Sequence, residues 1–250
     1  MSNSSSEPGP IRNKPRGPLF PKLSLKVRYR HKVLLRRHVW PFTWPIILEL
    51  SCVVLMGIIS TVLVARLGAD KTAAVGFTDG ITWIIISVMT AVALGGSVVV
   101  AQSFGRGDRT SALSAAGQVM VLGMSVALAS MLSIFLFSDS MLYIVAYGAE
   151  DEVIALSDKY LNLVALSYPA LAITLVGSGI LRAVGNSRLP AMSNIAMNVL
   201  NILFSYPLIY GSHGLFGIEW QGFGMLGAAF GITLARWAGA VIILVCLTRN

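Results

Sequence analysis

The sequence predicts an all-α, polytopic membrane protein whose chain crosses the bilayer six times. Of its 250 residues, 55% are hydrophobic and 12% are charged, which is about half the charged fraction of a typical soluble domain. The apolar residues form six long runs, and each reaches or approaches the ~20 residues that span a ~30 Å hydrocarbon core. Most Lys and Arg residues lie before residue 40 or at the ends of these runs. This distribution is typical of topology signals rather than of a nucleic-acid-binding face, in spite of the net charge of +8.

Two regions differ in composition. Residues 1–39 are polar, basic and rich in Pro and Ser, and they lack the short apolar stretch and cleavage site of a signal peptide. We expect a disordered cytoplasmic tail there, and its basic segment from Lys22 to His38 suits contact with anionic membrane lipids. Residues 40–250 are expected to form a single six-helix transmembrane lobe.

The six spans are expected to follow the apolar runs. Their predicted ranges are 41–64, 79–104, 113–137, 156–181, 190–210 and 223–247. The longest connection is expected at 138–155, where the apolar and aromatic stretch 141–147 suits a short helix lying at the membrane interface.

The basic residues of the connections predict the orientation. The tail, the connections after the second and fourth spans and the last residues hold fifteen Lys and Arg, whereas the opposite side holds only Arg66, Lys71 and Lys159. The positive-inside rule therefore places both termini in the cytoplasm. We expect a multi-pass protein of a bacterial inner membrane.

Enzymatic chemistry finds no support in the residue pattern. The sequence contains no HExxH metal site and no GxxxxGK[ST] phosphate loop, and its three histidines lie outside the predicted spans. We therefore expect neither an enzyme nor a bound metal or cofactor.

The first span carries an unusual carboxylate, Glu49. A charge near the bilayer centre costs at least ~2.5–3.5 kcal/mol and normally faces a bundle interior or water. Ser60 lies eleven residues further on and therefore on the same helix face. Glu49 suits cation or proton exchange, but the same residue type also occurs as an interfacial carboxylate that extends to the cytoplasm, or as one that pairs with an arginine of the basic tail. Ser60 also suits helix packing.

The fifth span carries a continuous polar stripe. Asn194, Asn198, Asn201 and Ser205 recur at helical spacing on an otherwise apolar helix. Unsatisfied polar groups in lipid cost several kcal/mol. The stripe must therefore bond to neighbouring helices or line an aqueous cavity, and both interpretations stay open.

Several segments together resemble the multidrug and toxic compound extrusion (MATE) family. They are Trp44–Glu49 with Ser60–Gly68, Val100–Asp108, Leu181–Pro190, Asn198–Ile202 and Gly224–Ala229. The resemblance runs from about residue 40 to the end, and it rests on the order and spacing of these motifs. It implies an exporter of twelve helices in two six-helix lobes, which exchanges organic cations for protons or sodium ions.

The resemblance also has departures. Ser60 and Ser205 stand where many members carry aspartates, and Ile232 stands where the family has a threonine. The resemblance thus leaves Glu49 as the candidate titrating carboxylate of this lobe, with Ser60, Asn194, Asn198, Asn201 and Ser205 as candidate ion- or substrate-binding partners. The chain stops after six predicted spans, so a fragment, a truncated product and one half of a homodimer all remain open.

Two other functions remain as alternatives. One is a lipid-linked oligosaccharide flippase of a related superfamily, which would carry basic residues inside its cavity, where only Arg236 qualifies. The other is a membrane scaffold that transports nothing.

Overall fold

The computed structural model describes residues 40–212 and 220–249. The chain divides into two units, Met1–Pro41 and Phe42–Asn250, and the account below concerns the second. The basic tail of residues 1–39 lies outside the described residues, so its predicted disorder stays a prediction. In chain order the helices are α2 (Trp40–Ala65), α3 (Ala69–Gly105), α4 (Arg109–Val145), α5 (Asp151–Ala165), α6 (Tyr168–Ala183), α7 (Arg188–Tyr210) and α8 (Met225–Arg249).

The all-α, multi-span prediction is confirmed. Five of these helices are long and apolar enough to cross a membrane, and α5 and α6 form a sixth candidate span that is bent by 50° at the break between them. The strands β1 (Gly211–Ser212) and β2 (Trp220–Gln221) form an antiparallel pair between α7 and α8. The protein is therefore a multi-pass helical membrane protein.

The predicted spans differ from the structure in several places, of which three are described here. Helix α3 begins at Ala69 rather than at residue 79, because the Ala-rich segment before Asp79 is helical although it is less apolar. Helix α4 continues to Val145, so the stretch expected as a separate interfacial helix extends the third span. The fourth span is broken at residues 166–167, just ahead of Pro169, which has no amide hydrogen to donate and whose ring disfavours a continuous helix through this point.

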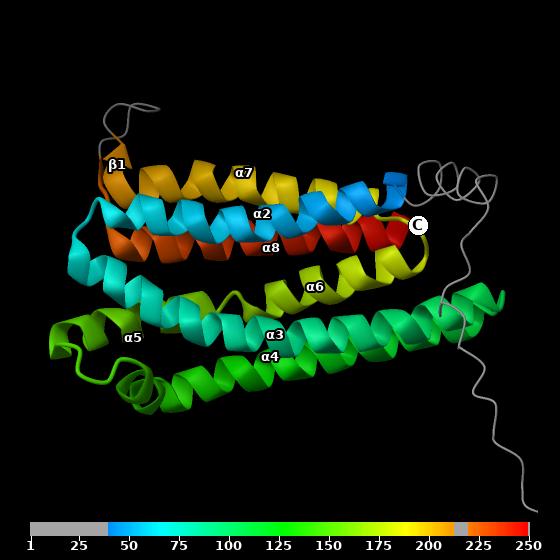
Figure 1. Ribbon diagram of the computed structural model, residues 1–250, viewed down its shortest axis with the longest axis horizontal. Coiled ribbons are helices and arrows are strands. Elements are labelled where there is room, and N and C mark those ends of the chain that lie inside the picture. The colour runs from blue at the N-terminus through cyan, green and yellow to red at the C-terminus, as the bar shows by residue number, and fades with distance from the viewer. Residues whose placement is uncertain (1–39, 213–219, 250) are drawn as a thin grey trace, which may run out of the picture. The chain divides into compact units, whose positions relative to one another are not determined.

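The helices pack into one bundle (Figure 1). Helices α3, α4, α5 and α6 lie against one another, α8 packs along α7, and α6 and α5 also contact α8. The largest buried side chains include Tyr168, Met89, Leu161 and Ile134. Together with the buried apolar residues around them they form the main core of the lobe.

Helices α2 and α7 run in the same direction side by side. Near the start of both helices, Asn194 of α7 reaches Glu49 of α2. Near their ends, the Tyr210 hydroxyl donates to the Leu63 carbonyl at 2.6 Å. These two links fix the relative register of α2 and α7, and this register decides which polar groups of the two helices meet.

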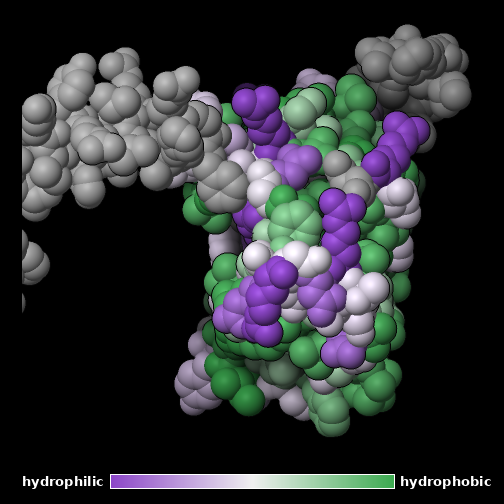
Figure 2. Space-filling model, turned by 90° about the vertical axis from the view of Figure 1, so that its right-hand side faces the viewer, coloured by the Kyte–Doolittle hydropathy of each residue, from purple (hydrophilic) through white to green (hydrophobic). Residues whose placement is uncertain are grey.

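One end of the bundle is strongly polar. The α3–α4 turn, the α6–α7 turn and the end of α8 lie together at this end (Figure 1), and Figure 2 shows hydrophilic side chains gathered across it. Arg106, Arg109 and Arg188 belong to these turns or to the first residue of a helix that follows one, and all three are exposed. The structure thus brings the basic connections together as the sequence predicts, while the side that this end faces stays a prediction.

Candidate functional site

The candidate site begins with the buried Glu49 carboxylate, which is 7% exposed. Its Oε1 accepts from Arg182 Nη1 at 2.5 Å, in an ion pair between α2 and the last turn of α6. Asn194 Nδ2 lies 3.5 Å from the same oxygen. The second oxygen, Oε2, is buried and has no hydrogen-bond partner among the described residues. Oε1 of Glu49 therefore links α2 to α6 and α7, and Oε2 remains available to a further hydrogen-bond donor or to a cation.

The polar stripe on α7 is buried along its whole length. Asn194 Nδ2 donates to the Pro190 carbonyl at 3.1 Å, and Asn198 Nδ2 donates to the Asn194 carbonyl at 2.9 Å. Asn201 Nδ2 donates to Ser205 Oγ at 3.3 Å. These donors are used within α7 itself, whereas the buried Oδ1 atoms of Asn198 and Asn201 have no partner among the described residues. The stripe thus presents hydrogen-bond acceptors to the lobe interior.

The predicted site residues come together in part. Glu49 meets Asn194, and Asn201 meets Ser205. Ser60 is buried at 6% exposure, but the structure shows no bond between it and the α7 stripe. Because α2 and α7 are parallel and Glu49 lies beside Asn194, the eleven-residue offset on both helices, roughly 16 Å, puts Ser60 near the level of Ser205.

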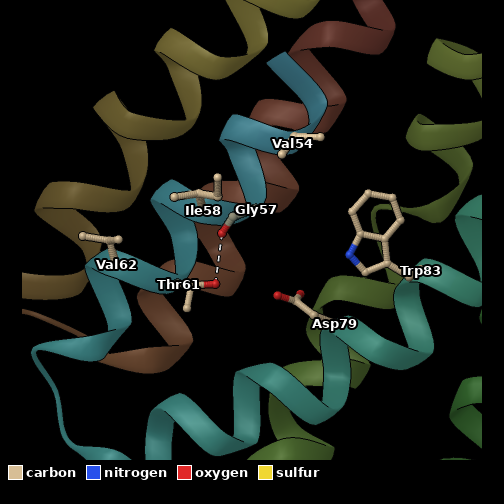
Figure 3. Close-up of a pocket in the computed structure, with 7 residues that line it drawn as sticks. All are labelled: Val54, Gly57, Ile58, Thr61, Val62, Asp79 and Trp83. Carbon is tan, nitrogen blue, oxygen red and sulfur yellow. Dashed lines mark hydrogen bonds between the residues drawn. The ribbon is translucent and has the colours of Figure 1, made fainter. Parts of the chain in front are cut away.

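A second carboxylate, Asp79, lies within a helix of the bundle, although the sequence pattern does not single it out. The predicted second span, 79–104, begins at this residue, whereas the structure places it ten residues inside α3, so that it is a second acidic side chain within a long apolar helix. Figure 3 shows the Asp79 side chain directed toward α2, into a cleft of about 370 Å³ between α2 and α3. The cleft is lined by Val54, Gly57, Ile58, Thr61, Val62, Asp79 and Trp83. One sequence signal indicates that a helix already runs through this region before Asp79. Between Ala69 and Thr78 there is no proline and only one glycine, Gly76, so that nothing there stops a helix.

The break between α5 and α6 is held by one face of α8. Arg236 is buried and its Nη1 donates to Ser167 Oγ at 2.8 Å. Thr233 Oγ1 donates to the Leu163 carbonyl, and Trp237 Nε1 donates to the Leu166 carbonyl, both at 3.3 Å. Backbone carbonyls that a helix break leaves without helical partners thereby receive side-chain donors. The lone arginine of the predicted spans therefore has a structural position at this break.

The fold and the buried polar groups define a multi-pass helical membrane protein with a polar interior. Comparison with known families then identifies its family. The profile of the MatE family matches residues 45–207, and the chain belongs to this family.

Three curated relatives illustrate the match. The uncharacterized transporter YisQ of Bacillus subtilis is 26% identical over 212 residues, which cover 85% of this chain and 45% of the relative. The probable multidrug resistance protein NorM of Thermotoga maritima is 26% identical over 76% of this chain and 39% of its own length. NorM of Synechocystis is 32% identical over 72% of this chain and 38% of its own length. The chain thus spans less than half the length of these relatives.

Solved structures share the fold. A MATE protein in its bent conformation superposes with a TM-score of 0.74 at 24% identity, covering 82% of this chain and 44% of that one. A MOP superfamily transporter from Pyrococcus furiosus, described as having a binding pocket of reverse polarity, gives a TM-score of 0.73 at 23% identity, covering 82% and 43%. These likenesses establish the lobe architecture. The relatives are named as a transporter and as multidrug resistance proteins, in agreement with the expectation that the chain is not an enzyme.

Proposed function

We propose that the chain is the amino-terminal lobe of a secondary transporter that exports organic cations across a bacterial inner membrane in exchange for protons or sodium ions. Family membership supports transport, since the relatives carry names of transporters and multidrug resistance proteins. The buried acceptor groups inside the lobe support a cation as the coupling ion.

The excess of buried acceptors is the observation that carries this proposal. Glu49 Oε2, Asn198 Oδ1 and Asn201 Oδ1 are buried without hydrogen-bond partners among the described residues. A buried polar group without a partner is costly, and acceptors are satisfied by proton donors or by metal cations with oxygen ligands. A proton or Na⁺ that enters from water supplies what these oxygens lack.

The ion pair of Glu49 provides a route from ion binding to helix movement. A proton or Na⁺ on Glu49 competes with Arg182 for the carboxylate and weakens the link between α2 and α6. Tyr210 continues to hold the other end of α2 through Leu63. Ion occupancy therefore biases α2 between an attached and a released position near Glu49, which is a shift between two arrangements of one lobe.

A second lobe, or a second copy of this chain, completes the transport path in this proposal. Transporter substrates bind near the bilayer midplane between repeats, so that one lobe supplies one wall. The small-molecule substrate is then an organic cation at that interface. Anionic lipids remain the proposed partners of the basic tail.

The flippase alternative has weaker support. A basic cavity requires free cationic side chains, but Arg182 is neutralised by Glu49 and Arg236 is engaged at the α5–α6 break. The described interior therefore offers acceptors rather than cationic donors.

The test is proton- or sodium-driven efflux of a fluorescent organic cation from proteoliposomes that hold this chain together with a second lobe. Glu49→Gln removes the charge while keeping the shape, and we expect efflux to fall by about tenfold or more, an effect of ~1.4 kcal/mol on the barrier. Asn201→Ala should weaken efflux less, because an amide only supports the site. The exposed Glu152→Gln serves as the matched control.

The outcomes separate the alternatives. The chain without a second lobe should show no driven efflux. If Glu49→Gln exports normally under the ion gradient, then the carboxylate is structural and the proposed coupling through this lobe is wrong.

A further inference from the structure

The turn between α3 and α4 holds two arginines close together. The Arg106 amide donates to the Gln102 carbonyl at 3.2 Å, and the Gly107 amide donates to the Phe104 carbonyl at 3.0 Å. Gly107 has a φ of 79°, a left-handed conformation that glycine adopts without strain. Arg109 begins α4 directly after this turn. Backbone hydrogen bonds thus fix the turn from which the side chains of Arg106 and Arg109 project.

Both arginines are exposed, and their charges are not neutralised. In the part of the chain that the structure describes, neither guanidinium takes part in an ion pair within 4.0 Å or in a hydrogen bond. Asp108, the carboxylate between them in sequence, accepts instead from Ser111 and Thr110. Both guanidinium groups therefore remain available to an anion.

Positive charge exceeds negative charge at the hydrophilic end of the bundle that Figure 2 shows. Among the described residues of this end, the exposed carboxylate of Asp108 stands against four exposed arginines: Arg106, Arg109, Arg188 and Arg249. Glu49 is buried, and its charge is offset by Arg182. The surface around the α3–α4 turn therefore attracts anions.

An apolar row continues from Arg109 along α4. Leu113, Gly117 and Val121 follow at intervals of four residues and form one slanted row on the helix surface. Leu113 is 74% exposed and Val121 is 67% exposed, and a Cβ added at Gly117 would meet nothing within 4 Å. Helix α4 lies at the edge of the bundle and packs on α3, α5 and α6 (Figure 1). The row is therefore open to the surroundings of the bundle.

The length of this row matches one leaflet of a bilayer. From Arg109 to Val121 it extends roughly 18 Å, and half of a ~30 Å hydrocarbon core is about 15 Å. A topology signal requires the charges alone, whereas a bound phospholipid requires the charges and an apolar row to be continuous. On α4 they are continuous, because Leu113 lies one turn beyond Arg109.

We propose that the α3–α4 turn and the outer row of α4 bind an anionic phospholipid, with Arg106 and Arg109 on its phosphate and with Leu113, Gly117 and Val121 along an acyl chain. This site is distinct from the basic tail of residues 1–39. It rests neither on export nor on ion coupling.

The chemistry favours an anionic phospholipid over a zwitterionic one. A guanidinium binds phosphate oxygens through two parallel N–H donors, and every phospholipid carries such a phosphate. A choline or ethanolamine headgroup also brings a positive charge, which the arginines of this end repel, whereas a glycerol headgroup brings only hydroxyls. A free phosphate ion makes no use of the apolar row.

A photoreactive phosphatidylglycerol with a diazirine in one acyl chain tests the proposal. This probe, or a phosphatidylcholine probe with the same chains, is added at a low share to phosphatidylcholine nanodiscs that hold the full chain. After illumination, peptide mass spectrometry measures the labelling of residues 113–121. We expect the anionic probe to label this segment about fivefold or more above the zwitterionic probe.

Substitutions of the arginines assign the preference to this site. Arg106→Gln together with Arg109→Gln should bring the two probes to equal labelling, whereas a preference produced by the basic tail would survive. Arg106→Lys together with Arg109→Lys should keep most of the preference, because the charges remain. Arg66→Gln, an exposed arginine in the α2–α3 turn, is the matched control and should leave the ratio unchanged.

Three results would overturn the proposal. The first is equal labelling by the two probes in the wild type, and the second is a preference that persists in the double glutamine variant. The third is loss of the anionic label when inorganic phosphate is added at constant ionic strength, which would make the two arginines a site for a free anion. Preferential labelling that depends on the arginines stands with either outcome of the efflux experiment.

Discussion

At the scale of single residues, Asp108 illustrates how a short turn fixes a charge. It is the N-cap of α4, and its carboxylate accepts from the Ser111 amide at 3.0 Å, the Ser111 hydroxyl at 2.6 Å and the Thr110 hydroxyl at 2.8 Å. Hydrogen bonds from Ser111 and then from Thr110 favour the charged form and lower the pKa of Asp108 to about 2. The carboxylate thus stabilises the start of α4 over the whole neutral range.

This shift predicts a defined pH dependence. A folded pKa below the ordinary value of ~3.9 means that Asp108 contributes its full stabilisation above about pH 4 and loses it as the pH falls toward about 2. The carboxyl chemical shift of Asp108, followed by NMR in nanodiscs, should therefore titrate near the lower value. Ser111→Ala removes one of the donors and should move the titration upward. An unchanged midpoint in Ser111→Ala would show that the cap is not the cause.

Some of the candidate site could be predicted from the residues alone. The helical spacing of the α7 stripe follows from the sequence, because it depends on periodicity within one helix. The expectation that Glu49 faces the bundle interior follows from the cost of a charge in the bilayer. The Arg182 partner of Glu49 lies 133 residues away, so only the tertiary packing reveals it. The position of Asp79 inside a helix does not follow from hydropathy, because an apolar run ends where it meets a charged residue. A helix can continue through a charged residue, as α3 does.

At the scale of the elements, the contact between α7 and α8 depends on small residues. A Cβ added at Gly231 would meet the backbone of Ser205, with its Cα at 2.7 Å and its N at 2.8 Å. A Cβ at Gly227 would meet the Leu208 carbonyl. Gly227 and Gly231, four residues apart on α8, therefore permit a close helix approach of the small-xxx-small kind.

This contact gives a prediction for packing. Gly231→Ala forces α8 away from the Ser205 end of the polar stripe, and we expect it to destabilise the lobe by about 1–3 kcal/mol, the usual cost of overpacking. Gly117→Ala on α4, where a Cβ meets nothing within 4 Å, is the matched control. Thermal unfolding in detergent, followed by tryptophan fluorescence, measures both. Equal melting temperatures for the two variants would contradict the close approach.

The elements show where sequence reasoning reaches its limit. Their number and type follow from the lengths of the apolar runs. Their ends do not, because the polar first turns of α3 and the last turns of α4 continue a helix beyond the hydrocarbon core, and both helices have 37 residues. The break at Ser167 interrupts a run that hydropathy treats as continuous.

At the scale of the whole molecule, the gathering of basic turns at one end predicts the orientation in the membrane. In a background with Cys52→Ala and Cys246→Ala, a cysteine at Glu150 should react with an impermeant maleimide added to intact cells. A cysteine at Asn186, in the α6–α7 turn, should react only after the membrane is opened. Labelling of Asn186→Cys in intact cells would reverse the predicted topology.

The α8 face that closes the α5–α6 break also has a consequence for biogenesis. Thr233 and Trp237 donate to backbone carbonyls about seventy positions earlier in the chain. The bent segment is therefore synthesised well before the two side chains that donate to it. Until α8 arrives, those carbonyls must stay with water or with an insertion factor, because lipid cannot satisfy them. The bent segment therefore reaches its final place only after α8 has been made, and a nascent chain that stops before α8 leaves these carbonyls without their side-chain donors.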